Sequence, residues 1–147
     1  HEIIGAVRQV VPPDRLLTFR VSNWAITDME VSLFADKAEW QQVIQMLSKE
    51  PIDAISVSTY DYRDKAFGTD QSMAQITREA TDLPIMICGK IYDRATAEDA
   101  LKDADIILSA KSILLNPGWV DDIRNNKELP LYKSEAANVA YTEEALP

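Results

Sequence analysis

The sequence predicts an α/β fold, in which about four parallel strands carry outer helices. Short β-branched runs alternate with segments of helical periodicity, and this strand-helix unit recurs along the chain. Such a succession requires a parallel sheet with right-handed crossovers. The loops that follow the first two strands are long, whereas the returns from helix to strand are only a few residues. Elaboration on the C-terminal side of the strands favours one half of a (β/α)8 barrel over an open sheet.

Prolines divide the first part of the chain. We expect a helix over residues 2–11, followed by a strand over residues 16–22. A loop over residues 23–36 then leads to a second helix over residues 37–49. Pro12 and Pro13 end the first helix, because proline cannot continue it. The second helix places Trp40 and Ile44 on one apolar face and ends before Pro51.

The rest of the chain repeats the same unit. Strands are expected over residues 54–58, 84–89 and 104–110, and helical segments over residues 72–80, 112–116 and 119–123. A further helix is expected to start with Thr96 as its N-cap, and Asp99 three residues later gives the spacing of a weaker capping box. Cys88 falls inside an apolar strand, which is typical of a small core residue. We assign residues 1–130 to the half-barrel and residues 131–147 to an irregular C-terminal tail.

Composition argues against several classes of partner. The chain has 15 basic and 24 acidic residues, a net charge of −9 and one histidine, at its first position. It therefore lacks the basic surface that binding to nucleic acid or to an anionic membrane requires. The single cysteine excludes an internal disulfide and a CxxC metal site, so no metal is expected and a cytoplasmic location is favoured. The sequence has neither a secretory signal nor a long apolar span, which favours a soluble protein.

The ends of two strands predict a phosphate site. Two continuous apolar runs close on Gly89-Lys90 and on Ala110-Lys111. A small residue at a strand end lets a ligand approach the backbone. In a (β/α)8 barrel, the loops after the last two strands frequently bind phosphate. The two strand ends therefore indicate a shared phosphate cradle.

Six segments, taken in order, resemble a known family. They lie at residues 19–22, 53–58, 83–89, 97–101, 104–107 and 114–119. Their order and spacing resemble the C-terminal half of the Old Yellow Enzyme family, which are NADH-dependent flavin oxidoreductases. The resemblance implies βα units five to eight of a (β/α)8 barrel, with FMN as cofactor, NADH or NADPH as co-substrate and a small-molecule substrate. It also implies hydride transfer from the nicotinamide to FMN and on to an activated alkene.

The resemblance implies roles for particular residues. Arg20 matches the arginine at the end of the fifth strand, which holds the pyrimidine edge of the flavin, and a permanently charged planar guanidinium suits that role. Gly89 and Lys90 match the phosphate loop after the seventh strand, and Ala110 and Lys111 match the loop after the eighth. The family commonly has Gly-Arg at the eighth-strand position. Because lysine lacks the bidentate fork of arginine and alanine leaves less room for the backbone, we expect an altered phosphate contact.

The half of the barrel that carries the family's substrate chemistry has no counterpart in this sequence. The family's histidine or asparagine pair and its proton-donating tyrosine belong to the earlier strands, so no catalytic residue is assigned. Tyr60, in a loop above the expected flavin position, is a candidate substrate contact. Four strands leave open edges, so the missing half-barrel or a homo-oligomer partner is expected to close the fold. Two alternatives stay open: a non-enzymatic half-barrel that binds a phosphate ligand or a protein, and a different phosphate-binding barrel enzyme.

Overall fold

Four parallel strands form the centre of the molecule, which the computed structural model describes for residues 1–25 and 28–129. The strands are β1 (Thr18–Ser22), β2 (Trp24–Ala25), β3 (Asp28–Ser32), β4 (Ala54–Ser58), β5 (Ile85–Cys88) and β6 (Ile106–Leu108). The helices are α1 (Glu2–Val10), α2 (Lys37–Leu47), α3 (Met73–Arg78), α4 (Arg94–Ala100), α5 (Lys111–Leu115) and α6 (Trp119–Arg124). The expected α/β half-barrel with about four parallel strands and outer helices is confirmed.

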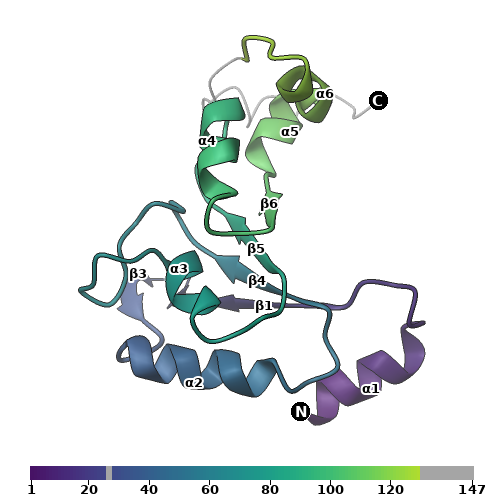
Figure 1. Cartoon of the computed structure of the whole chain (residues 1–147), viewed down its shortest axis with the longest axis vertical. Helices are drawn as coiled ribbons and strands as arrows, with labels where there is room; N and C mark the ends of the chain where they lie inside the picture. Colours follow the sequence, from purple (N-terminus) through teal and green to yellow (C-terminus); the bar gives the residue numbers. More distant parts are fainter. Residues whose placement is uncertain (26–27, 130–147) are drawn as a thin grey trace.

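The sheet has the strand order β1-β4-β5-β6, and every neighbouring pair is parallel. Strand β4 lies inside the sheet and all of its residues are buried. The strand direction turns steadily from β1 to β6 (Figure 1), as the right-handed twist of a sheet requires. Within the described residues, β1 and β6 are the two edges of this sheet.

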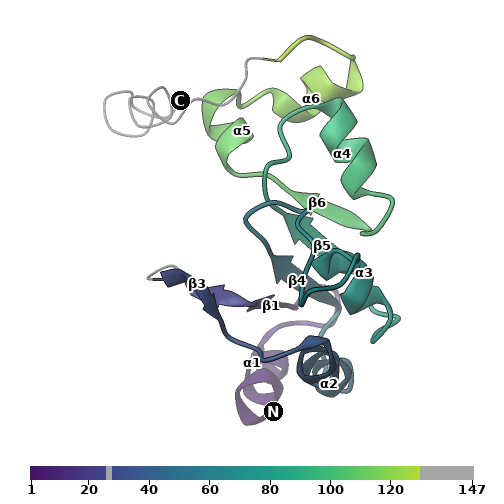
Figure 2. The ribbon, with the colours of Figure 1, turned by 90° about the vertical axis from the view of Figure 1, so that its left-hand side faces the viewer.

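One face of the sheet packs against helices. Val21, Val57 and Ile87 are register neighbours on adjacent strands, and all three belong to the buried core. Trp40 and Ile44 of α2 are fully buried in the same core, which confirms the predicted apolar face of this helix. In the side view of Figure 2, α3 and the strand β3 lie on opposite sides of β4.

The other face of the sheet carries a different set of side chains. Arg20 lies opposite Ser56 and Ser22 lies opposite Ser58, and alternate residues of a strand share a face. Cys88 lies two residues beyond Met86, the register partner of Ser56, so it projects to the same face. In a closed barrel this face lines the interior.

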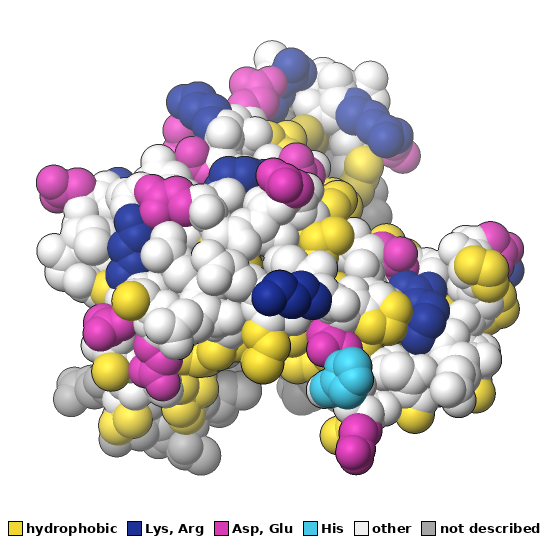
Figure 3. All heavy atoms as spheres, turned by 60° about the horizontal axis from the view of Figure 1, so that its bottom comes forward, with side chains coloured by type: hydrophobic (Ala, Val, Ile, Leu, Met, Phe, Trp, Pro, Cys, Tyr) yellow, Lys and Arg dark blue, Asp and Glu magenta, His cyan; other side chains and the backbone are white. Residues whose placement is uncertain are grey.

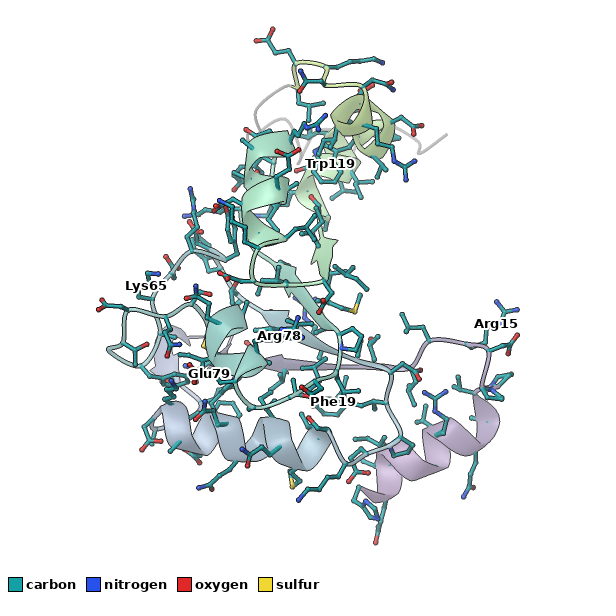
Figure 4. The ribbon with its side chains drawn as sticks, in the orientation of Figure 1. Arg15, Phe19, Lys65, Arg78, Glu79 and Trp119 are labelled. Carbon is teal, nitrogen blue, oxygen red and sulfur yellow. The ribbon has the colours of Figure 1, made fainter. Side chains whose placement is uncertain are left out.

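Helices α4 and α6 extend the same core beyond β6 (Figure 1). Trp119, labelled in Figure 4, is buried in the core with Ala97 and Ala100 of α4. Its indole Nε1 donates a hydrogen bond to the carbonyl oxygen of Tyr92 at 2.8 Å. This contact fixes the last described helix over the loop that follows β5.

The predicted start of α4 at Thr96 is wrong. The helix begins at Arg94, and Asp93 is its N-cap. The carboxylate of Asp93 accepts a hydrogen bond from the Thr96 backbone N–H at 2.8 Å, and the Thr96 hydroxyl oxygen accepts one from the Asp93 backbone N–H at 3.1 Å. Thr96 is therefore the third helical residue of a reciprocal capping box. Asp93 takes the N-cap position, for which aspartate is preferred over threonine.

The segment predicted as a loop over residues 23–36 contains an antiparallel ribbon. Strands β2 and β3 pair, with Trp24 opposite Ser32. The backbone N–H of Leu33 donates to the carbonyl oxygen of Asn23 at 2.9 Å and closes the base of the ribbon. The polar and apolar residues of β3 alternate in the sequence, which is the strand signal that the prediction missed. The strand predicted over residues 104–110 is also shorter, since β6 spans only Ile106–Leu108.

Helix α1 ends before Pro12 as predicted, but most of its apolar stripe is exposed. Ile4 is its one buried residue, whereas Ile3 and Val10 are 80% and 78% exposed. Figure 3 shows hydrophobic side chains on the surface at this side of the molecule, between charged ones of both signs. No helix within the described residues is long and apolar enough to cross a membrane. The predicted tail over residues 131–147 lies outside the described residues.

Candidate functional site

A cavity of about 590 Å3 lies at the C-terminal ends of β5 and β6. The six residues singled out from the sequence all line it: Arg20, Tyr60, Gly89, Lys90, Ala110 and Lys111. The chain has a net charge of −9, yet no Asp or Glu of the described residues lines this cavity. The cavity is therefore locally positive, which favours an anionic ligand. Its volume falls within the range of ordinary small-molecule sites.

Arg20 lies on β1, and its side chain crosses toward β5. The guanidinium Nη2 donates hydrogen bonds to Ser58 Oγ at 2.9 Å and to Cys88 Sγ at 3.4 Å. Cys88 was expected in the core, but it is only half-buried and lines the cavity. The expectation was wrong because Cys88 is the last residue of β5 and projects to the face away from the helices.

The turn after β5 has a backbone that requires glycine. Gly89 has a φ of 113°, and Lys90 follows with a φ of 51°. A Cβ on Gly89 would lie 2.7 Å from the carbonyl oxygen of Thr59, closer than real Cβ contacts allow. The backbone N–H of Tyr62 donates to the Gly89 carbonyl oxygen at 3.3 Å, so the turn rests directly on the loop after β4.

The ammonium group of Lys90 is engaged by that same loop. Its Nζ lies 3.5 Å from Asp61 Oδ2 and 4.6 Å from the centre of the Tyr60 ring. Asp61 is buried and also accepts two hydrogen bonds from the side chain of Arg63, at 2.9 Å from Nε and 2.7 Å from Nη2. These Arg63 bonds hold the pKa of Asp61 at about 2, below its ordinary value of 3.8. Lys90 lines the cavity, but its charge is shared with a carboxylate.

Asp61 gives the protein a pH-dependent increment of stability. Because its pKa is lower in the folded state than its ordinary 3.8, the increment is complete above that value and is lost as the pH falls toward 2. Replacing Asp61 by asparagine should therefore destabilise the protein at about pH 6 but much less at about pH 2. Urea unfolding of both proteins across this range measures the difference. Asp64→Asn, in the same loop, is the control, and a wild-type advantage that persists undiminished at about pH 2 contradicts the assignment.

The loops after β5 and β6 are tied together. Ser109 Oγ and Ser112 Oγ both donate to the carbonyl oxygen of Ile91, at 3.3 Å and 3.1 Å. Ala110 is the N-cap of α5, and no side chain of the described residues caps that first turn. Lys111 begins this helix and lines the cavity. The two predicted strand ends therefore form one continuous wall.

Tyr60 lies where two cavities meet. A smaller cavity of about 300 Å3 adjoins the first between the β2-β3 ribbon and the loop after β4. Both cavities are lined by Trp24, Thr59 and Tyr60. The Trp24 indole Nε1 donates to the Ser58 carbonyl oxygen at 3.3 Å, which anchors the shared wall to β4. Tyr60 borders both cavities and is 55% exposed, so it is open to contact from either one.

Three residues of the site were not singled out as site residues from the sequence. Ser58, Cys88 and Asp61 contact Arg20 or Lys90, and the sequence shows them only as small or acidic residues at strand ends. Their position was the available signal, because side chains at the carboxyl ends of parallel strands gather at one edge. Which of them meet a given cation depends on side-chain direction, which spacing alone does not give.

No family model and no curated protein matches the sequence. Similar solved structures include morphinone reductase in complex with tetrahydroNAD, at 19% identity and a TM-score of 0.68, covering 97% of this chain and 38% of that one. TcOYE with pHBA matches at 15% identity and a TM-score of 0.73, with the same coverage. A variant of NCR from Zymomonas mobilis matches at 21% identity and a TM-score of 0.62, covering 86% of this chain and 41% of that one.

These similar structures belong to the Old Yellow Enzyme family. The chain has the fold of part of their barrel. It spans about two fifths of their length, since 38% of morphinone reductase and 41% of the NCR variant are covered. The expected half-barrel is thus confirmed at the level of the fold.

Proposed function

We propose that this chain is the FMN-binding half of an NAD(P)H-dependent flavin oxidoreductase of the ene-reductase type. The observation that carries the proposal is the cavity at the strand ends, which has Arg20, Lys90 and Lys111 in its wall and no carboxylate among its described lining residues. The fold shared with Old Yellow Enzymes supports the choice of flavin over other anionic ligands.

The residues present fit the two ends of FMN. Gly89, Lys90 and Ala110 line the cavity, so a phosphate there would meet the backbone of the two turns. Lys111 lies in the adjoining wall and supplies a positive charge. Arg20 lies on the barrel-interior face and suits a ring that gains negative charge on reduction. In this proposal Lys111 and the two backbone turns hold the phosphate, and Lys90 acts with Asp61 and Tyr60.

The chain's own contribution is binding and orientation. When bound, FMN supplies hydride transfer from NADH or NADPH to an activated alkene. Arg20 holds the ring edge, the loops after β5 and β6 hold the phosphate, and Tyr60 borders the space left for a small-molecule substrate. A chain that covers 38% of morphinone reductase leaves substrate polarisation to other elements.

We further infer that other strands complete the barrel. Within the described residues, β1 and β6 are the free edges of the four-stranded sheet, and eight strands close this kind of barrel. Phe19 on β1 and Ile106 on β6 are 36% and 38% exposed. The remaining strands would come from the rest of the polypeptide or from a second copy. Sedimentation mass with and without added FMN distinguishes these two sources.

Replacing Lys111 by methionine tests the phosphate assignment. A charge-assisted hydrogen bond contributes about 1.5–3 kcal/mol, so FMN affinity should fall by roughly tenfold or more. Riboflavin, which lacks the phosphate, should bind the variant and the wild type equally. Fluorescence quenching of each flavin gives both dissociation constants. Lys49→Met, two residues beyond the C-terminal end of α2 and outside the cavity lining, is the matched control.

An equal loss of both flavins in Lys111→Met would contradict the phosphate assignment. A wild type that binds inorganic phosphate but neither flavin would instead favour a sugar-phosphate barrel, the alternative that the sequence left open.

A further inference from the structure

The hydrogen-bond partners of Arg20 are neutral, whereas most other arginines of this chain pair with carboxylates. Five others pair with carboxylates: Arg8, Arg63, Arg78, Arg94 and Arg124. Within the described residues, the hydrogen bonds of Arg20 go instead to the hydroxyl of Ser58 and the thiol sulfur of Cys88. A carboxylate partner would fix the guanidinium and also cancel much of its charge. A neutral partner fixes it and leaves the charge available.

The two anchors set the direction of the side chain. Arg20 lies opposite Ser56 in the sheet, whereas Ser58 lies two residues farther toward the C-terminal edge, a displacement of roughly 6.6 Å. Cys88 ends the next strand, β5. The guanidinium is thus drawn from the middle of β1 toward the strand ends, where the cavity lies.

The anchors also leave donors free for a ligand. Both hydrogen bonds, of 2.9 Å and 3.4 Å, come from the same nitrogen, Nη2. A guanidinium has five N–H donors in a planar fork, so most of them are not used by Ser58 or Cys88. An unanchored arginine loses rotamer entropy when a ligand fixes it, and anchoring removes part of that cost before the ligand arrives.

We propose that Ser58 and Cys88 are positioning residues that aim the Arg20 guanidinium at the ring of the bound flavin. The proposal rests on the proposed function, because it takes a flavin ring as the ligand of Arg20. The position of the Arg20 guanidinium relative to the ring, and hence its effect on the reduction potential of the flavin, would then depend on two neutral side chains from neighbouring strands.

The test compares Ser58→Ala and Cys88→Ala with Ser56→Ala. Ser56 is a matched control, because it is a buried serine on the same sheet face and its Oγ has no hydrogen-bond partner in the described residues. Each protein is titrated with FMN and with riboflavin, and the potential of the bound flavin is measured. Since the contact is with the ring, both anchor variants should lose affinity for the two flavins by the same factor, severalfold.

The potential gives the second readout. A positive charge beside the ring favours its reduced form, so a loosened Arg20 should lower the potential. A tenfold loss of preference for the reduced form is a shift of about 30 mV for a two-electron couple. Cys88→Ser keeps an acceptor at this position and should restore the wild-type values. Ser58 is buried, so Ser58→Ala could fail to fold. Cys88 is only half-buried, and Cys88→Ala then provides the same test.

Alkylation of the Cys88 thiol tests directly whether the flavin ring lies beside it. Bound riboflavin should slow alkylation of Cys88 by iodoacetamide, read from the mass of the peptide that contains it. Anchor variants that match Ser56→Ala in affinity and potential, or a Cys88 thiol that riboflavin does not protect, would overturn the proposal while leaving FMN binding intact. A wild type that binds neither flavin would overturn the proposed function and, with it, this inference.

Discussion

Replacing Gly89 by alanine is expected to abolish FMN binding and to destabilise the fold by about 2–4 kcal/mol. The added Cβ would meet the backbone oxygens of Thr59 and Tyr60 at 2.7 Å and 2.8 Å. Backbone atoms cannot rotate away as a flexible side chain can, so the turn after β5 must separate from the loop after β4. The φ of 113° adds strain of its own, because L-residues rarely adopt it.

The separation would break two contacts that hold the cavity wall. The Thr59 hydroxyl donates to the Cys88 carbonyl oxygen at 2.5 Å, and the Tyr62 N–H donates to the Gly89 carbonyl oxygen at 3.3 Å. Gly68→Ala is the matched control. Gly68 also has a positive φ, of 66°, but nothing lies within 4 Å of a Cβ there, so its cost should be only about 1–2 kcal/mol with FMN binding retained. Equal losses in the two variants would contradict this account.

Replacing Trp40 by alanine should destabilise the protein by about 3–5 kcal/mol. Trp40 is fully buried beneath the sheet, and its ring meets Phe34 edge-on, with the ring centres 5.1 Å apart. Its indole Nε1 donates to Thr77 Oγ1 at 3.0 Å, and the Thr77 hydroxyl donates to the Met73 carbonyl oxygen at 2.7 Å. The substitution therefore leaves a cavity and removes a hydrogen bond from a fully buried hydroxyl.

Urea unfolding measures this loss against Met46→Ala on the same helix. Met46 is 57% exposed, so its truncation should change the unfolding free energy by less than about 1 kcal/mol. A Trp40→Ala protein that unfolds within 1 kcal/mol of wild type would show that α2 does not hold the sheet in the way the packing indicates.

The inner strands and the turn after β5 were predictable because their signals are local. The apolar runs that became β4, β5 and β6 lie where the sequence placed them, and Gly89 marks a turn that only glycine fits. Helix α2 was equally clear, since Trp40 and Ile44 share its buried face. In each case a few neighbouring residues determine the outcome.

What the sequence could not give depends on contacts between distant segments. The direction of the Lys90 ammonium is set by Asp61 and Tyr60, which lie about thirty residues earlier in the chain. Whether Cys88 faces the core or the cavity depends on the alternation of β5, which a continuous apolar run conceals. Strand β2 was missed because a two-residue strand leaves no period to detect, and the alternation of β3 is too short to stand out without its partner strand.

We expect the cavity at the strand ends to hold FMN, and we expect the bound flavin to accept hydride from a nicotinamide. Anaerobic absorbance of the full-length protein, loaded with FMN, washed free of excess and then mixed with NADH or NADPH, tests both expectations most directly. A yellow protein that retains flavin and loses its visible absorbance when the nicotinamide is added is the expected result. A colourless protein, or a bound flavin whose absorbance neither nicotinamide changes, would contradict them.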